Sequence, residues 1–283
     1  MLLLTGNNCM SLNLDVVINT PTDSVDMKAG LDTLGGTSDA ARYIAEAILT
    51  GRVRERQTHK ADVRTTLKQS FSGSYGQKFS IDIYDDAAHK EYRRIGKVAF
   101  FELMAYFLSE SVYKQYPFNL SAKAEGVISR LGEKVKILTS QLRKSSLQRL
   151  HEVPEKFGYS VKIRYRQNRE VQHELATFDR ETAETIYARP SPEPVKIKAA
   201  ITRLNINTGN GRLLVKHCDE TVAFGFAGRY KYVPVETKEN ISSNLSHNNV
   251  RDAEKWLYLD IIARPIKLRD GKVVKYIITE LQL

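Results

Sequence analysis

The sequence predicts an α+β protein, with an N-terminal antiparallel sheet and a long helical hairpin followed by a C-terminal small β-barrel of OB or SH3-like type. Apolar residues alternate with polar ones in the first part of the chain, and they recur at helical spacing between residues 88 and 152. Between these regions and the end of the chain, RPSPEP has three prolines in six residues, a composition that resists both helix and sheet. We therefore expect an α+β domain at 1–188, a proline-rich linker at 189–194 and a barrel domain at 195–283.

The first strand is predicted at LNLDVVIN, residues 12–19, where apolar residues alternate. We expect residues 23–33 to pair with it. A helix follows in GGTSDAARYIAEAILTGR, because Thr37 or Ser38 is a good N-cap residue and Gly51 is a good residue to end it. The glycines and hydroxyls of GGTSDAAR are also typical of an anion-binding helix N-terminus, but they complete neither a Walker loop nor a dinucleotide motif, and ordinary capping explains them.

Two alternating runs, at 59–71 and 78–84, flank the segment SGSYG, which is the pattern of an antiparallel hairpin. Gly73 and Gly76 raise the alternative of a phosphate-binding loop or a G-x-x-G clamp. Both of those sites need a helix after the glycines, whereas KFSIDIY alternates like a strand. We therefore expect the two glycines to supply positive φ angles in the hairpin loop.

Apolar stripes predict two long helices that form an antiparallel hairpin. The first spans about 88–116 and the second about 121–152, with Pro117 as the breaker between them. We interpret both stripes as core rather than as a dimerisation seam. A strand–turn–strand follows at 159–178, and a short helix begins from a cap at Asp179. The stripes consist of Val98, Phe101, Ala105, Leu108 and Val112, and of Leu131, Val135, Leu138 and Leu142.

Beyond the linker every segment is predicted to be strand. Turn signals such as NTGNG and RDGK separate most of the runs. Five or six short strands in a segment of this length are typical of a small closed or half-open barrel. The runs are VKIKAAITRLNI, GRLLVKH, TVAFGFA, KYVPVE, KWLYLDIIARPIKL and KVVKYIITEL.

The chain is basic, with 43 Lys and Arg against 33 Asp and Glu and a net charge of +10. Residues 1–87 carry 9 basic and 11 acidic residues, a net of −2. Residues 88–187 carry 18 and 12, and residues 195–283 carry 15 and 9, so each of these regions has a net of +6. A balance of this sign favours nucleic acid, anionic membrane or acidic protein partners.

We predict that DNA or RNA binds along a track formed by a basic helix face and a basic strand face, together with a barrel segment on whose rings bases stack. The alternative is an ordinary solvated surface. Phe224 and Phe226 share a parity that fits a barrel interior, whereas Tyr230 and Tyr232 are more open. The candidate residues are Arg130, Lys134, Arg143, Lys144 and Arg149 on the helix, Lys162, Arg164 and Arg166 on the strand, and Arg229, Tyr230, Lys231 and Tyr232 in the barrel.

No catalytic constellation is complete, so the protein is expected to have no catalytic centre of its own. Arg54 and His59 have an R-x4-H spacing, which resembles that of HEPN-type ribonucleases, where the pair handles the 2′-hydroxyl and the leaving phosphate. ETK at 236–238 and PEK at 154–156 resemble fragments of a restriction-type nuclease signature, but neither has an upstream Asp in one strand–turn–strand unit. The histidines show no metal-ligand spacing, so no metal and no cofactor are expected.

The two cysteines, Cys9 and Cys218, lie far apart, which is typical of a reduced, cytoplasmic chain. The first residues have neither the basic segment nor the apolar run of a signal peptide. No window approaches the ~18–20 apolar residues that a spanning helix needs. We therefore expect a cytoplasmic location and no membrane partner.

The layout resembles a group of uncharacterised bacterial proteins with an N-terminal α+β module, a helical hairpin and a C-terminal small β-barrel, some of them found in anti-phage defence or mobile-element loci. The segments that carry the resemblance are GGTSDAARYIAEAILTGR, FSGSYGQKFSIDI, and ITRLNINTGNGRLLV with the later VAFGF. The resemblance implies an accessory role in such a system and supplies no active site. With the charge, it predicts a non-catalytic nucleic-acid-binding protein that works with a protein partner. A protein–protein scaffold subunit is the alternative, and a nuclease is the second alternative.

Overall fold

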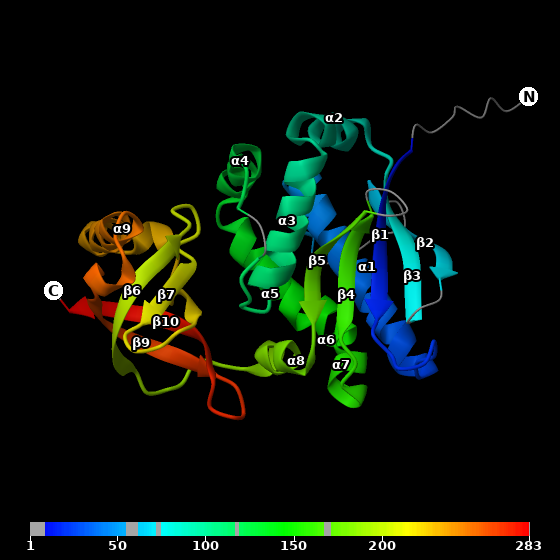
Figure 1. Ribbon diagram of the computed structural model, residues 1–283. Helices are drawn as coiled ribbons and strands as arrows, with labels where there is room; N and C mark the ends of the chain where they lie inside the picture. Colours follow the sequence, from blue (N-terminus) through cyan, green and yellow to red (C-terminus); the bar gives the residue numbers. More distant parts are fainter. Residues whose placement is uncertain (1–8, 55–61, 72–74, 117–118, 167–170, 283) are drawn as a thin grey trace, which may run out of the picture. The chain divides into compact units, whose positions relative to one another are not determined.

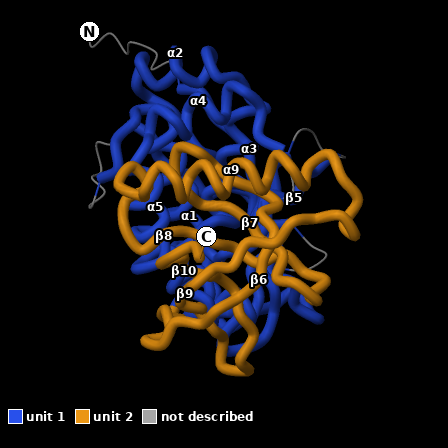
Figure 2. The backbone as a smooth tube through the Cα atoms, turned by 90° about the vertical axis from the view of Figure 1, so that its left-hand side faces the viewer, with its two compact units in different colours: residues 1–186 blue, residues 187–283 orange. Residues whose placement is uncertain are grey.

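The computed structural model describes residues 9–54, 62–71, 75–116, 119–166 and 171–282 (Figure 1). The protein is mixed α+β and forms two compact units, residues 1–186 and residues 187–283 (Figure 2). The first unit contains a five-stranded sheet, and the second contains a closed barrel. The proline-rich segment predicted as a linker lies at the start of the second unit, where Ser191 N–H donates to the carbonyl of Pro265 at 2.8 Å.

The sheet of the first unit is antiparallel throughout, with the strand order β2-β3-β1-β4-β5. β1 lies at its centre, and Leu14 is opposite Phe79 of β3 on one side and Tyr165 of β4 on the other. The predicted first strand, the hairpin after it and the strand–turn–strand at 159–178 are confirmed. The strands are β1 (Met10–Ile18), β2 (Val63–Phe71), β3 (Tyr75–Ile83), β4 (Val161–Arg166) and β5 (Gln172–Phe178).

The first helix, α1 (Met27–Thr50), begins earlier than predicted, so residues 27–33 do not pair with β1. Its N-cap is Asp26, whose carboxylate accepts from the N–H of Ala29 at 2.9 Å, rather than Thr37 or Ser38. Gly36 lies inside the helix, at a position where the backbone of α6 (Ser146–Leu150) leaves no room for a side chain. A Cβ there would lie 2.3–2.9 Å from backbone atoms of α6. A glycine that looks like a helix breaker is here a point of close helix–helix approach.

The two predicted long helices are broken into shorter ones. Gly96 has φ +83 and separates the first into two, and Gly132 has φ +50 and interrupts the second. The predicted stripes are buried except for Val98, which is 71% exposed on the outer side of α3. The helices are α2 (Asp86–Ile95), α3 (Lys97–Glu110), α4 (Ala122–Leu131), α5 (Lys134–Lys144), α6 (Ser146–Leu150), α7 (Glu152–Phe157) and α8 (Arg180–Tyr187).

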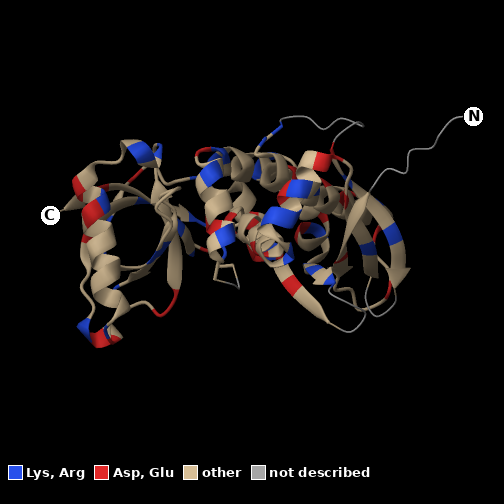
Figure 3. Cartoon of the chain, turned by 90° about the horizontal axis from the view of Figure 1, so that it is seen from above, with Lys and Arg blue, Asp and Glu red and all other residues tan. Residues whose placement is uncertain are grey.

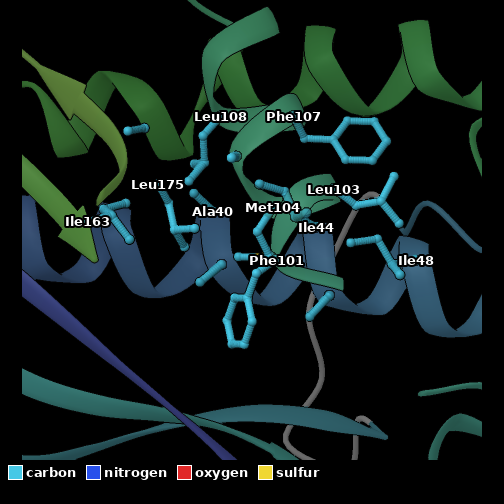
Figure 4. Packing of buried hydrophobic residues seen from close by; sticks show 14 of the residues in the cluster. Ala40, Ile44, Ile48, Phe101, Leu103, Met104, Phe107, Leu108, Ile163 and Leu175 are labelled. Carbon is cyan, nitrogen blue, oxygen red and sulfur yellow. The ribbon is translucent and has the colours of Figure 1, made fainter. Parts of the chain in front are cut away.

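The core of the first unit lies between one face of the sheet and the helices. Figure 4 shows side chains of α1 and α3 meeting, among them Ile44 and Leu103, with Ile163 of β4 in the same cluster. β1 contributes its even-numbered residues to this core, from Leu12 to Ile18. The opposite face carries charged side chains, among them Asp15, Lys162 and Arg164. Among the described elements no helix covers it (Figure 1). We call this opposite face the outer face.

Gly76 lies within β3 and not at a positive φ, so its predicted role is wrong, while Gly73 lies outside the described residues. A bulge between Leu67 and Ser70 shifts the register of β2, and Phe71 therefore comes opposite Gly76 on the outer face. A Cβ at Gly76 would lie 2.3 Å from Cε2 and 2.5 Å from Cζ of the Phe71 ring. The glycine is needed because an aromatic ring packs flat on its backbone.

The barrel of the second unit closes in the strand order β10-β8-β7-β6-β9, with β9 also paired to β10. All pairs are antiparallel except β8 with β10, which is parallel. Phe224 lies fully buried inside, as predicted, and Phe226 is half-buried. The strands are β6 (Val195–Leu204), β7 (Gly211–Val215), β8 (Thr221–Phe226), β9 (Leu259–Lys267) and β10 (Val273–Gln282).

The prediction that the second unit is all strand is wrong, because α9 (Val235–Asn249) connects β8 to β9. The predicted strand KYVPVE contributes instead to the 3-10 turn η1 (Tyr230–Tyr232) and to the start of α9. Asparagines attach this helix to the barrel: Asn244 Oδ1 accepts from the N–H of Ile201 at 2.8 Å, and Asn248 Oδ1 from that of Leu257 at 2.9 Å. A helix held by amide side chains has a weak apolar stripe, which is why its sequence pattern is hard to recognise. A second 3-10 turn, η2 (Ala253–Lys255), follows.

His151, between α6 and α7, is buried and holds two helices in place. Its Nδ1 donates to the carbonyl of Leu147 at 2.6 Å, and its Nε2 lies 3.0 Å from the Thr182 hydroxyl of α8. Burial lowers the pKa of this ring from 6.5 to about 4. The ring is therefore neutral in the folded protein at neutral pH.

We expect the free energy of unfolding to fall by roughly 3 kcal/mol through His151 as the pH drops from about 7 to about 4. Below pH 6.5 the unfolded chain binds a proton at this ring and the folded chain does not, and the loss is complete near pH 4. Urea unfolding at a series of pH values measures the effect. His151→Gln, which cannot titrate, should show a flatter pH dependence over this window, and equal slopes for the two proteins would contradict the assignment.

Gly76→Ala is expected to lower the free energy of unfolding by about 1–3 kcal/mol, because the new methyl group meets the ring of Phe71. In a Phe71→Ala background the same change should cost much less. Gly126→Ala is the control, since a Cβ there meets nothing within 4 Å on α4. Urea denaturation of the unaltered protein, the two single variants at Gly76 and Phe71 and the double variant measures these costs. An equal cost of Gly76→Ala in both backgrounds would show that the Phe71 ring is not the reason for the glycine.

Candidate nucleic-acid interface

The predicted helix face is divided among α4, α5 and α6, and Arg143 belongs to the interior of the fold. Its Nη1 donates to the carbonyl of Ser111 at 2.7 Å, and its Nη2 donates to the carbonyl of Thr185. Its guanidinium lies over the ring of Tyr113, 4.3 Å from the centroid. These contacts tie α5 to the end of α3 and to α8, so Arg143 acts as a clamp between elements.

Arg130 and Arg149 pair with carboxylates of the same unit. Arg130 Nη1 lies 2.6 Å from Oε1 of Glu91, and hydrogen bonds from Arg94 and then from Arg130 lower the pKa of that carboxyl. Arg149 Nη1 lies 3.0 Å from Oδ2 of Asp39. Both guanidinium groups are thus already engaged by carboxylates, although Glu91 is shared with Arg94.

The two predicted lysines of α5 differ in whether their ammonium groups already have a partner. Lys134 Nζ donates to the carbonyl of Gly51 at 2.7 Å and thereby covers the end of α1. Lys144 is exposed, and the described part of the chain gives it no hydrogen-bonded or charged partner. Of the helix residues predicted to contact nucleic acid, Lys144 is the one whose ammonium group remains available.

The three strand residues, Lys162, Arg164 and Arg166, lie together on the outer face, as the alternation predicts. They are matched there by two carboxylates. Lys162 Nζ lies 3.1 Å from Oε2 of Glu174, and both side chains are close to half exposed. Arg164 and Arg166 both face Asp15 of β1.

Asp15 is the most constrained charge in this unit, because its side chain is 0% exposed. Arg166 holds it with Nε at 3.1 Å from both carboxylate oxygens and Nη2 at 2.7 Å from Oδ2. Arg164 is less engaged. Its Nη2 lies 3.6 Å from Oδ2, and its buried Nε has no hydrogen-bond partner among the described residues. The two arginines therefore have different functions: Arg166 neutralises the buried acid, and Arg164 keeps donors unused.

In the barrel, Tyr230 and Tyr232 lie on the 3-10 turn between β8 and α9. Tyr232 is 73% exposed, and Lys231 Nζ lies 4.7 Å from the centroid of its ring. Tyr230 is half-buried against Phe226, with ring centroids 5.5 Å apart, and burial raises its pKa. Arg229 is exposed at the start of the turn. This segment brings an exposed aromatic ring and a cation together.

The outer face contains a second aromatic and cationic cluster that the sequence did not reveal. Among the described residues, three cations lie over the ring of Phe71, at 5.9 Å from its centroid for Lys78, 5.9 Å for Arg164 and 5.6 Å for Arg166. Strict alternation groups Phe71 with Leu67 on one face of the strand, and the bulge turns it to the other face. A local signal does exist, since an aromatic residue lies opposite a glycine across the hairpin.

The nuclease candidates do not form a catalytic arrangement in the described structure. Arg54 lies between two acids, with Nε 2.7 Å from Glu46 and Nη2 3.1 Å from Asp62, while His59 lies outside the described residues. ETK at 236–238 and PEK at 154–156 both lie on helices, α9 and α7. Within the described residues no group of three or more His, Cys, Asp or Glu side chains is placed to hold a metal ion.

Comparison with known protein families, with curated proteins and with solved structures finds no match to this chain. None of the helices in the described part of the chain combines the length and the apolar character needed to cross a membrane. Lys and Arg residues are interspersed with Asp and Glu residues in both units (Figure 3). The available charges, rather than the total charge, therefore define the candidate interface.

Arg166→Ala is expected to lower the free energy of unfolding by up to about 3 kcal/mol, because it leaves the buried Asp15 with Arg164 alone. Adding Asp15→Ala to this variant should recover much of the loss. Lys162→Ala on the same strand face is the matched control, and its exposed pair with Glu174 should be worth at most about 1 kcal/mol. Equal costs for the two single variants, measured by urea unfolding, would contradict the special role of Asp15.

Proposed function

We propose that this protein binds single-stranded nucleic acid through the barrel of its second unit, and that the barrel is of the OB type. The observation that carries the proposal is the barrel topology. If the barrel strands are numbered in chain order, their order around the barrel is first, second, third, fifth and fourth, and the fourth pairs with the first. The third and fifth strands are parallel, and a helix connects the third to the fourth. OB-folds are five-stranded Greek-key barrels that bind oligonucleotides on the second and third strands and on the loop between the first and second.

The exposed aromatic segment lies beside that loop, which supports the proposal. A Cβ at Gly209, in the connection from β6 to β7, would lie 2.3 Å from Cδ2 of Tyr230. Tyr230 therefore packs against the loop, and Tyr232 follows two residues later in the same short turn. The exposed ring of Tyr232 is thus close to the region where barrels of this type contact their ligands.

The chemistry of the segment suits a single strand. A base stacks on an exposed tyrosine without regard to its sequence, and a neighbouring ammonium group pairs with the phosphate. Tyr232 and Lys231 supply these two contacts, with the ammonium group 4.7 Å from the ring centroid. A duplex keeps its bases stacked on each other, so this arrangement favours unpaired strands.

We expect Tyr232→Ala to weaken the binding of a labelled single-stranded oligonucleotide by about fivefold or more, because it removes one stacked base. Tyr232→Phe keeps the ring and should bind like the unaltered protein. Fluorescence anisotropy with DNA and RNA strands and a duplex measures the affinities.

Phe157→Ala serves as the control for loss of an exposed ring, since Phe157 is 44% exposed on α7 of the other unit. The proposal is overturned if the unaltered protein binds neither strand at low salt, or if Tyr232→Ala and Phe157→Ala bind equally well.

A further inference from the structure

Phe71 on the outer face of the first unit has the properties of a stacking platform. One side of its ring packs on the backbone of Gly76, as shown by the 2.3–2.8 Å that separate a Cβ there from Cε2, Cζ and Cδ2. Three described cations lie over the ring, with their charged groups 5.6–5.9 Å from its centroid. The ring is half-buried, so part of it remains accessible to solvent.

Two of the cations retain hydrogen-bonding capacity. The buried Nε of Arg164 has no partner among the described residues, and its 3.6 Å contact with Asp15 is too long for a hydrogen bond. Lys78 has no ion pair or hydrogen bond within the described structure, although it lies opposite Asp15 in register. Guanidinium and ammonium groups with unused donors are the groups that bind phosphate in proteins, and here both lie beside one aromatic ring.

The charge balance of this part of the outer face is positive. Of the residues that the structure describes, four cations, Lys78, Lys162, Arg164 and Arg166, lie there with the carboxylates of Asp15 and Glu174, so the net charge of these six is +2. Asp15 organises the arginines without cancelling them, because one buried acid faces two guanidinium groups. The described helices leave this face uncovered (Figure 1).

We propose that the outer face is a second contact site for single-stranded nucleic acid, with a base stacked on Phe71 and its phosphate bound by Lys78 and Arg164. This inference rests on the proposed function of the barrel and adds to it a site in the first unit. An aromatic ring with cations near it, on a sheet face that no described helix covers, fits a nucleotide, because the base stacks on the ring and the cations bind the phosphate backbone.

The test compares Phe71→Leu and Lys78→Gln in the full chain, alone and with Tyr232→Ala, by anisotropy of a labelled single-stranded oligonucleotide. Phe71→Leu keeps apolar bulk and should weaken binding by about fivefold or more in both backgrounds. Lys78→Gln should make the log–log salt slope less steep by about 0.7. Lys28→Gln, an exposed lysine on α1, is the charge control and should leave the slope unchanged.

The outcomes separate the two proposals. If Tyr232→Ala weakens binding while Phe71→Leu and Lys78→Gln behave like the control, the outer-face site is overturned and the barrel site stands. If the unaltered protein binds no single strand, both proposals fail. Thermal unfolding of each variant shows whether it is folded, and Lys78→Gln keeps the test decisive even if Phe71→Leu unfolds, because that lysine has no ion pair or hydrogen bond with a described residue to lose.

Discussion

The buried charge of Asp15 is the constraint on which the first unit depends. A carboxylate with no exposed surface is stable only if it is paired, and its closest partner, Arg166, lies 151 residues later in the chain. The pairing puts Asp15 opposite Arg164 in the register of β1 and β4. A slip of one residue would turn the acid into the apolar core, so this contact specifies both the neighbour and the register of the central strand.

The same contact decides which positive charges can act. Arg166 is committed to Asp15, while Arg143, Arg130 and Arg149 are committed to carbonyls and acids elsewhere in the unit. A net charge of +10 therefore overstates the cationic surface. What remains are a few separate groups beside aromatic rings, which suits an unpaired strand better than a continuous track suits a duplex.

Local pattern was enough to predict the sheet strands, the end of α1 at Gly51 and most barrel strands, because alternation and capping act over a few residues. It failed where a distant contact overrides the local signal. Gly36 looks locally like a helix breaker, but it is the point where α6 packs closely against α1. The helix α9 is attached to the barrel unit by hydrogen bonds of Asn244 and Asn248 rather than by an apolar stripe.

The candidate site was predictable in its residue types and not in its geometry. The alternation of 162–166 correctly placed three cations on one face, but nothing local indicates that a buried acid on β1 lies under two of them. Alternation alone groups Phe71 with Val63, Thr65 and Leu67, because a bulge cannot be recognised from alternation. Tyr232 was recognisable because it lies in a short polar segment next to Lys231.

The salt dependence of single-strand binding tests the central claim that most of the predicted cations are already engaged. Each phosphate contact contributes about −0.7 to the slope of log affinity against log salt concentration. Four available cations, Lys78, Lys144, Arg164 and Lys231, predict a slope of about −3. A slope of about −7, which corresponds to a phosphate contact from each of the ten predicted Lys and Arg residues, would contradict the account.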